Sequence, residues 1–350
     1  MSIDFDPPGV RHERHWTPSG SVILCAISQA RTRSVLFRVH KSLLIEQSEV
    51  FESMFDIPQG DSKSTENAEY YDRAPLVRLP DTAEEVSGLL NALRDPLTLC
   101  EPSAMPDTPM RLRNALHLAT KYLMTDLRSK LVRILEREWP SSLEELEIRN
   151  HAFDEFPKAN MFKMSYEGWP RIFTPEPAAS IALAEEFDIE SILPWAYYDL
   201  TRCVASRCWD SCLSEEEGSF VETSTSRGKA ARWECLSASA LLRMLRIREF
   251  LNGERTKRFK SYVELTGAHY TVGHSSCEDS FCQLLSEAHS EATARSDSDP
   301  DILKLLRRLS MRISARPNKE LCVCCRSVFL RGVYKRKDEV WREVERMSRL

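Results

Sequence analysis

The stretch from residue 21 to residue 55 constrains the fold more than any other part of the chain. Two apolar runs, SVILCAIS (21–28) and VLFRVH (35–40), are each short enough for a strand and flank the polar segment QARTRS. KSLLIEQ follows at once, and Ser48 then stands at the N-cap position of a helix. The apolar face of that helix comprises Val50, Phe51, Met54 and Phe55. The stretch therefore predicts a β-hairpin that leads directly into short helices.

The chain up to about residue 140 continues this pattern. APLVRLP (74–80) is a third strand candidate, and Asp81-Thr82 is expected to cap a helix that stops at Asp95-Pro96. Two more helices are predicted over 110–124 and 125–139. The predicted order is β-β-α-α-β-α-α-α, which makes the fold class α+β. Residues 1–18 are expected to be a disordered leader.

An internal repeat links this part of the chain to the next. ALHLATKYLMTDL (115–127) aligns with SIALAEEFDIESI (180–192). The aligned pairs are Leu118 with Leu183, Ala119 with Ala184, Tyr122 with Phe187, Met124 with Ile189 and Leu127 with Ile192. In both copies a helix that ends Ala-x-x-aromatic turns at once into a second helix, so the sequence predicts that one helical hairpin recurs and stacks on its neighbour.

The remaining organisation is a linker followed by a helical region. Residues 141–174 are acidic and contain prolines, which indicates an acidic linker or insertion, and 175–350 are expected to be mostly α-helical. One helix there is predicted over 301–315. Another is predicted within 236–253, with an apolar face formed by Leu241, Leu242, Leu245 and Phe250.

The overall composition narrows the class of protein. The chain has 350 residues, a net charge of −5 and eleven cysteines. No stretch approaches the roughly 18 continuous apolar residues of a membrane span, and the N-terminus has no apolar signal segment. These features indicate reduced thiols and an intracellular protein, in the cytoplasm or the nucleus, with no membrane association.

The stretch at 37–55 resembles the BTB/POZ domain. The resemblance is carried by the Val-His-Lys step at the end of the second strand and by the Ser-x-x-Phe-x-x-Met-Phe helix behind it. These motif residues are Val39, His40, Lys41, Ser48, Phe51, Met54 and Phe55. The third strand and the helix after it follow in the same order, so the resemblance covers a domain at 19–140.

A closer likeness is to the BTB proteins expanded in mushroom-forming fungi. It adds the Met-Phe-x-Ile-Pro-Gln ending at 54–59, the hairpin that starts at Pro175 and a C-terminal Cys-x2-Cys. The chain departs from the pattern at Ser21, where an Asp commonly precedes the first-strand Val, and in its ERMSRL ending.

The resemblance implies a non-catalytic protein-protein interaction module that commonly forms homodimers. For some members it implies a substrate-adaptor role in cullin-3 ubiquitin ligases. The sequence itself also favours a protein without catalytic activity, because it contains no phosphate-binding glycine motif, nucleophile elbow or His-Glu-x-x-His motif. His40 is more simply a half-buried histidine bonded to nearby backbone than a catalytic base.

The cysteines of the last quarter suggest a metal. Cys277-x4-Cys282 and Cys322-x2-Cys325 are two short pairs, and four thiolates can close a tetrahedral zinc site. His274 and Cys324 are alternative ligands. The other interpretation is reduced, half-buried thiols without a metal, and Cys203, Cys208, Cys212 and Cys235 are interpreted as such thiols.

The alternative function is that of a zinc-bearing, nucleic-acid-associated regulator. Its phosphate contacts would come from the basic residues near the C-terminus, which are Arg331, Lys335, Arg336, Lys337, Arg342 and Arg346. Aromatic residues between them are few, so a solvated amphipathic helix is the simpler interpretation. Its apolar face would comprise Val333, Val340, Trp341 and Val344.

Overall fold

The computed structural model describes most of the chain as two separate units. The described residues are 9–56, 69–96, 106–155, 174–214, 229–256, 275–294 and 302–349. Unit 1 contains the chain up to Ser141 and the short piece that ends at Pro175. Unit 2 contains Ser142–Lys163 and Glu176–Leu350. The division at Ser141 lies next to the predicted end of the first domain at residue 140, while the piece that ends at Pro175 was predicted to belong to the linker.

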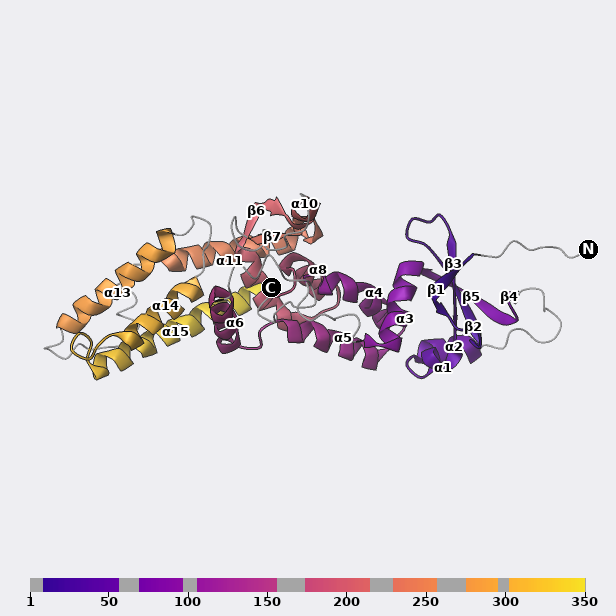
Figure 1. Cartoon of the computed structure of the whole chain (residues 1–350), viewed down its shortest axis with the longest axis horizontal. Coiled ribbons are helices and arrows are strands. Elements are labelled where there is room, and N and C mark those ends of the chain that lie inside the picture. The colour runs from indigo at the N-terminus through magenta and orange to yellow at the C-terminus, as the bar shows by residue number, and fades with distance from the viewer. Residues whose placement is uncertain are drawn as a thin grey trace, which may run out of the picture. The chain divides into compact units, whose positions relative to one another are not determined.

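Unit 1 is an α+β unit with a small sheet and helices, as predicted (Figure 1). Its elements are β1 (Val10–Trp16), β2 (Val22–Ile27), β3 (Ser34–Val39), α1 (Lys41–Ile45), α2 (Glu49–Asp56), β4 (Tyr70–Tyr71), β5 (Ala74–Thr82), α3 (Ala83–Arg94), α4 (Thr108–Lys121) and α5 (Thr125–Glu138). The described strands of unit 1 form one sheet in the order β1-β3-β2-β5-β4. β2 runs antiparallel to β3, which confirms the predicted hairpin, and parallel to β5.

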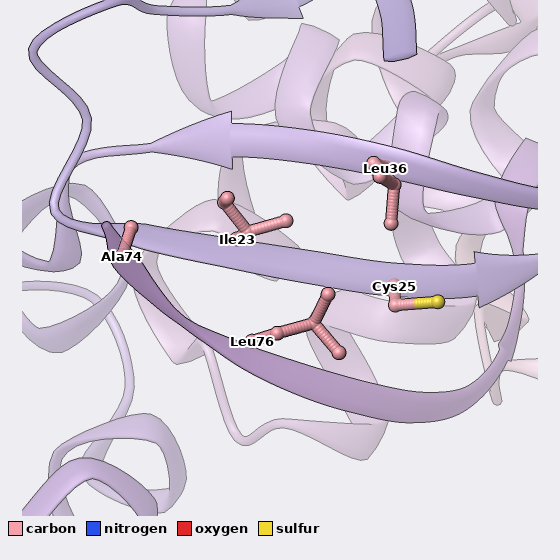
Figure 2. Packing of buried hydrophobic residues seen from close by; sticks show 5 residues of the cluster. All are labelled: Ile23, Cys25, Leu36, Ala74 and Leu76. Carbon is pink, nitrogen blue, oxygen red and sulfur yellow. The ribbon is translucent and has the colours of Figure 1, made fainter. Parts of the chain in front are cut away.

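The core of the sheet lies around its central strand. Because side chains alternate along a strand, Ile23 and Cys25 of β2 face the same side as residues of the neighbouring strands β3 and β5. Figure 2 shows this cluster, which comprises Ile23, Cys25, Leu36, Ala74 and Leu76. Val22, Leu24 and Ala26 on the opposite side of β2 are buried as well. The continuous apolar run of β2 therefore reflects a strand that is covered on both faces.

The prediction of a disordered leader is wrong for residues 10–16, which form β1. This strand pairs in parallel with β3 and occupies one edge of the sheet. Aromatic contacts to other strands hold it there: His12 stacks on Phe37 with ring centroids 4.9 Å apart, and Trp16 meets Tyr71 edge-on with centroids 6.4 Å apart. The pairing depends on a partner strand that comes later in the chain, so no local pattern in VRHERHW reveals it.

The helix starts of unit 1 follow the predicted caps. The Ser48 hydroxyl accepts a hydrogen bond from the Phe51 N–H at 3.2 Å at the start of α2. Thr82 caps α3 through a capping box, because its side chain accepts from the Glu85 N–H while the Glu85 carboxylate accepts from the Thr82 N–H at 2.8 Å. These local bonds satisfy N–H groups that a helix leaves without internal partners.

Unit 2 is mostly helical, as predicted (Figure 1). Its elements are α6 (Leu143–Glu155), α8 (Pro177–Glu186), η3 (Glu190–Ile192), α9 (Leu193–Thr201), β6 (Cys203–Cys208), α10 (Trp209–Ser214), β7 (Lys229–Ala231), η4 (Trp233–Cys235), α11 (Ala238–Thr256), α13 (Ser275–Ala294), α14 (Ile302–Ala315) and α15 (Val323–Ser348). β6 and β7 form a parallel pair. α14 matches the helix predicted over 301–315.

Two expectations about unit 2 need correction. The acidic segment 141–174 was expected to be a linker or insertion, yet its first part forms α6 and belongs to unit 2. Lys337 of α15 donates to the Glu147 carboxylate at 2.7 Å, so an ion pair joins α6 to α15. The predicted apolar face of α11 is wrong too, since Leu242 and Leu245 are exposed. The buried face consists of Ala240, Met244, Ile247 and Leu251.

The predicted recurrence of one helical hairpin is confirmed, with one copy in each unit. In both copies the residue after the aromatic has a positive φ, 53° at Leu123 and 55° at Asp188. This left-handed residue lets the Met124 N–H reach the Ala119 carbonyl at 2.8 Å, and the Ile189 N–H reach the Ala184 carbonyl at 2.9 Å. All ten aligned residues are buried. The motif is a Schellman-type helix end followed at once by a new helix.

Within the described ranges, no helix combines the length and the apolar character that crossing a membrane requires.

Candidate functional site

The motif residues that carry the resemblance form the junction between the sheet and α2 in unit 1. Val39 is buried at the end of β3, whereas His40 is exposed, with its Nε2 3.4 Å from the Ser19 hydroxyl. His40 was expected to be half-buried and bonded to backbone, so that interpretation is wrong in both details. The Lys41 N–H donates to the Ser21 hydroxyl at 2.9 Å. Ser21 therefore anchors the start of α1.

The second half of the motif packs on the α4–α5 hairpin. Phe51 is fully buried and stacks on Tyr122 with ring centroids 4.4 Å apart. The Ser48 hydroxyl donates to the Tyr122 carbonyl at 2.6 Å. Met54 and Phe55 are half-buried, and the Phe55 ring stacks on Phe51 with centroids 5.8 Å apart. Ser48 thus fixes α2 at two points, by capping its first turn and by bonding to the hairpin.

Tyr122 also connects this packing to the end of β5. Its hydroxyl and the Lys121 ammonium both donate to the carboxylate of the buried Asp81. Burial, followed by the bond to Asp81, raises the pKa of Tyr122. The sequence predicts Asp81 as part of a helix cap, but Thr82 alone caps α3. Asp81 instead pairs with residues far along the chain, which no local pattern reveals.

The cysteines of unit 2 supply the strongest candidate for a chemical site. The Sγ atoms of Cys277, Cys322 and Cys325 all lie within 4.8 Å of one another. Cys277 is buried near the start of α13, and the other two stand at the start of α15. Three of the four proposed zinc ligands are therefore brought together. Cys282 is exposed and is not part of the group.

The helix start positions the Cys322 and Cys325 thiols. Cys322 is the N-cap residue of α15, and its Sγ accepts a hydrogen bond from the Cys325 N–H at 3.4 Å. Burial, followed by hydrogen bonds with Cys322 and Cys277, raises the pKa of Cys325 to about 12. Crowded thiols resist ionisation because each thiolate would repel the next, and a bound cation removes that penalty.

Among the described side chains, no other cysteines gather in the same way. Cys324 is exposed, Cys203 is buried on β6 and Cys235 is exposed. Cys208 is half-buried. His274 lies outside the described residues, as does the side chain of Cys212.

The basic residues near the C-terminus are partly engaged in ion pairs within unit 2. Arg336 pairs with Glu254 and Glu339, and Lys337 pairs with Glu147. Arg346 pairs with Glu343 at 2.6 Å. The apolar face predicted for this helix is confirmed, because Val333, Val340, Trp341 and Val344 are all buried.

Comparisons with protein-family models, with curated proteins and with solved structures found no match for this chain. The BTB/POZ resemblance therefore stays a prediction.

Proposed function

We propose that the chain is a non-catalytic protein-protein interaction protein whose unit 1 associates with a second copy of itself. The observation that carries the proposal is the way in which the BTB-type motif is used. Ser48 and Phe51 join α2 to the α4–α5 hairpin through Tyr122, while β2, β3 and β5 pair as a hairpin with a parallel third strand. This is the element order that the resemblance implies, and homodimers are its common outcome.

The edge of the sheet offers a second argument for self-association. β1 is an edge strand, and an edge strand presents backbone groups that can pair with another chain. The opposite edge is β4, which is only two residues long. Short edge strands limit pairing. A symmetric dimer would use the same surface on both copies, so one edge strand is sufficient for a closed assembly.

The experiment is a measurement of subunit number on the full-length chain. Light scattering after size exclusion and native mass spectrometry, carried out over a dilution series, should both give a dimer. A monomer at the highest concentration tested would refute self-association. Leu242→Ser, which changes an exposed apolar residue on α11 of unit 2, serves as a control for non-specific association and should leave the dimer intact.

The adaptor role with cullin-3 rests on the resemblance alone, and a pull-down with purified cullin-3 would test it. The nucleic-acid alternative is weakened at the C-terminal helix, although Arg331, Lys335, Arg342 and Arg346 are exposed. Three of its six proposed phosphate-binding residues are held in ion pairs, and Lys337 is buried. We therefore keep protein association as the single proposed function.

A further inference from the structure

We propose that Cys277, Cys322 and Cys325 bind one zinc ion through three thiolates and that this ion joins α13 to the start of α15. The site lies in unit 2 and goes beyond the function proposed for unit 1.

The distances suit a tetrahedral thiolate site. A Zn–S bond of about 2.3 Å in a tetrahedron places neighbouring sulfur atoms about 3.8 Å apart. The three Sγ atoms already lie within 4.8 Å of one another, so small side-chain rotations are sufficient to close the site. Thiolates are soft ligands and select zinc over the hard cations that prefer oxygen. Three sulfurs fill three of the four positions of the ion.

The backbone presents two of the sulfurs together. Cys322 and Cys325 stand at the N-cap and in the first turn of α15. Their spacing puts both sulfurs on one turn, and the Cys325 N–H already donates to the Cys322 sulfur. Cys277 completes the group from another helix. The site therefore forms only when α13 and α15 are folded against each other, because its ligands come from both helices.

An aromatic contact beside the cysteines joins the same two helices, α13 and α15. Phe281 follows Cys277 by one helical turn on α13, and Phe329 follows Cys325 by one turn on α15. Both rings are buried, and they stack with centroids 4.1 Å apart and planes inclined by 14°. The two helices therefore meet along a stripe of one cysteine and one aromatic each. This contact sets the distance between the cysteines independently of a metal.

Hydrogen bonds hold the connection between α14 and α15 in place. The Ser280 hydroxyl of α13 donates to the Glu320 carbonyl at 2.9 Å. Arg326 donates to the carbonyl of Leu321, directly before Cys322, and to that of Arg316, directly after the end of the preceding helix. Because these bonds fix the chain on both sides of the cysteines, the site is organised before an ion arrives.

The two neighbouring cysteines provide matched controls. Cys282 lies on α13 about 140° around the helix from Cys277, since each residue advances about 100°. Cys324 lies beside Cys325 in sequence, but its side chain is exposed. Neither belongs to the group, although each lies within a few residues of a proposed ligand in the sequence.

The test uses the full-length chain, reconstituted with Zn²⁺ or Co²⁺ under reducing conditions. Elemental analysis should give one ion per chain, and the Co²⁺ form should show sulfur-to-cobalt charge-transfer absorption. Cys277→Ser, Cys322→Ser and Cys325→Ser should each lower the metal content at least tenfold at limiting metal. Cys282→Ser and Cys324→Ser should keep the full content. Equal loss in a control and a ligand variant would overturn the assignment.

A second measurement needs no variant and so does not depend on variants that fold. In the zinc-loaded chain, alkylation should spare Cys322 and Cys325 and modify Cys282 and Cys324. A chelator should then expose Cys322 and Cys325 to alkylation while far-ultraviolet circular dichroism keeps its helical signal. No metal uptake, or a Cys322–Cys325 disulfide formed in place of uptake, would refute the proposal.

Discussion

His15 on β1 should make the stability of unit 1 sensitive to mild acid. The side chain is 1 % exposed, and its Nε2 has no hydrogen-bond partner within the described part of the chain. Burial, followed by the charges of His12 and Arg94, lowers the pKa of His15 to about 4. An unfolded histidine has a pKa of about 6.5. Between about pH 4 and pH 6.5 the His15 ring is therefore protonated in the unfolded state and neutral in the folded state.

The sign and the size follow from proton linkage. Because the folded-state pKa is depressed, the contribution of His15 to stability is complete above about pH 6.5 and is lost as the pH falls toward 4. At pH 5 an unfolded histidine is almost fully protonated, while the folded His15 is still about nine-tenths neutral. The free energy of unfolding should fall by about 2 kcal/mol between pH 7 and pH 5 through this residue alone.

The assay compares the wild-type chain with His15→Leu, which replaces the ring by an apolar side chain that does not titrate. Because two units need not unfold together, hydrogen exchange of β1 and β3 peptides at pH 7 and pH 5, corrected for intrinsic rates, should accompany urea unfolding. The variant should lose most of the acid sensitivity. Some should remain, since burial also lowers the pKa of His12.

Two results would contradict this reasoning. One is the same fall in stability between pH 7 and pH 5 in His15→Leu as in the wild-type chain. The other is a nuclear magnetic resonance titration that places the pKa of the His15 ring at its ordinary value near 6.5.

Three further predictions concern packing and backbone conformation, and urea unfolding combined with hydrogen exchange of the affected unit measures each. Tyr122→Phe removes a bond to the buried carboxylate of Asp81 and should destabilise unit 1 by about 1.5–3 kcal/mol, whereas Tyr70→Phe, at a 66 % exposed residue, should stay within about 0.5 kcal/mol. Gly88→Ala would place a Cβ 2.8 Å from the Asn114 Cβ and should destabilise unit 1 by about 1–3 kcal/mol. The control is Gly253→Ala, where an added Cβ meets nothing within 4 Å, and it should stabilise unit 2 by about 0.5–1 kcal/mol. Two variants of the same sign would contradict the assigned packing of α3 on α4. Leu123→Gly should relieve a left-handed residue and stabilise unit 1 by about 0.5–1 kcal/mol, and Asp188→Gly should gain less because Asp tolerates that conformation better; a larger gain at Asp188 would be inconsistent with this account.

Local signals in the sequence predicted much of unit 1. Alternation and apolar runs located β2, β3 and β5, and the caps at Ser48 and Thr82 lie where the sequence placed them. Each of these features depends on residues within a few positions of one another. The repeat was predictable for the same reason, since a helix end and the turn after it form one local motif.

Features that depend on distant partners were not predictable. β1 needs β3, and Asp81 needs Tyr122, and neither partner can be inferred from the neighbouring residues. The apolar face of α11 was misjudged because its many leucines allow more than one stripe, and the packing in unit 2 selects one. For the candidate metal site, Cys-x2-Cys was a reliable local unit. Cys-x4-Cys on a helix points its two sulfurs to different sides, so only Cys277 can join.

α15 connects the candidate metal site to an aromatic cluster within unit 2. A helix of 26 residues is about 39 Å long, and Trp341 lies about 24 Å along the axis from Cys325. Near that far end, Trp341 stacks on Trp195 with ring centroids 3.9 Å apart and meets the edge of Tyr198. Trp341 lies on the same helix as Cys325, so a displacement of α15 at the candidate metal site would be expected to alter the Trp195–Trp341 contact.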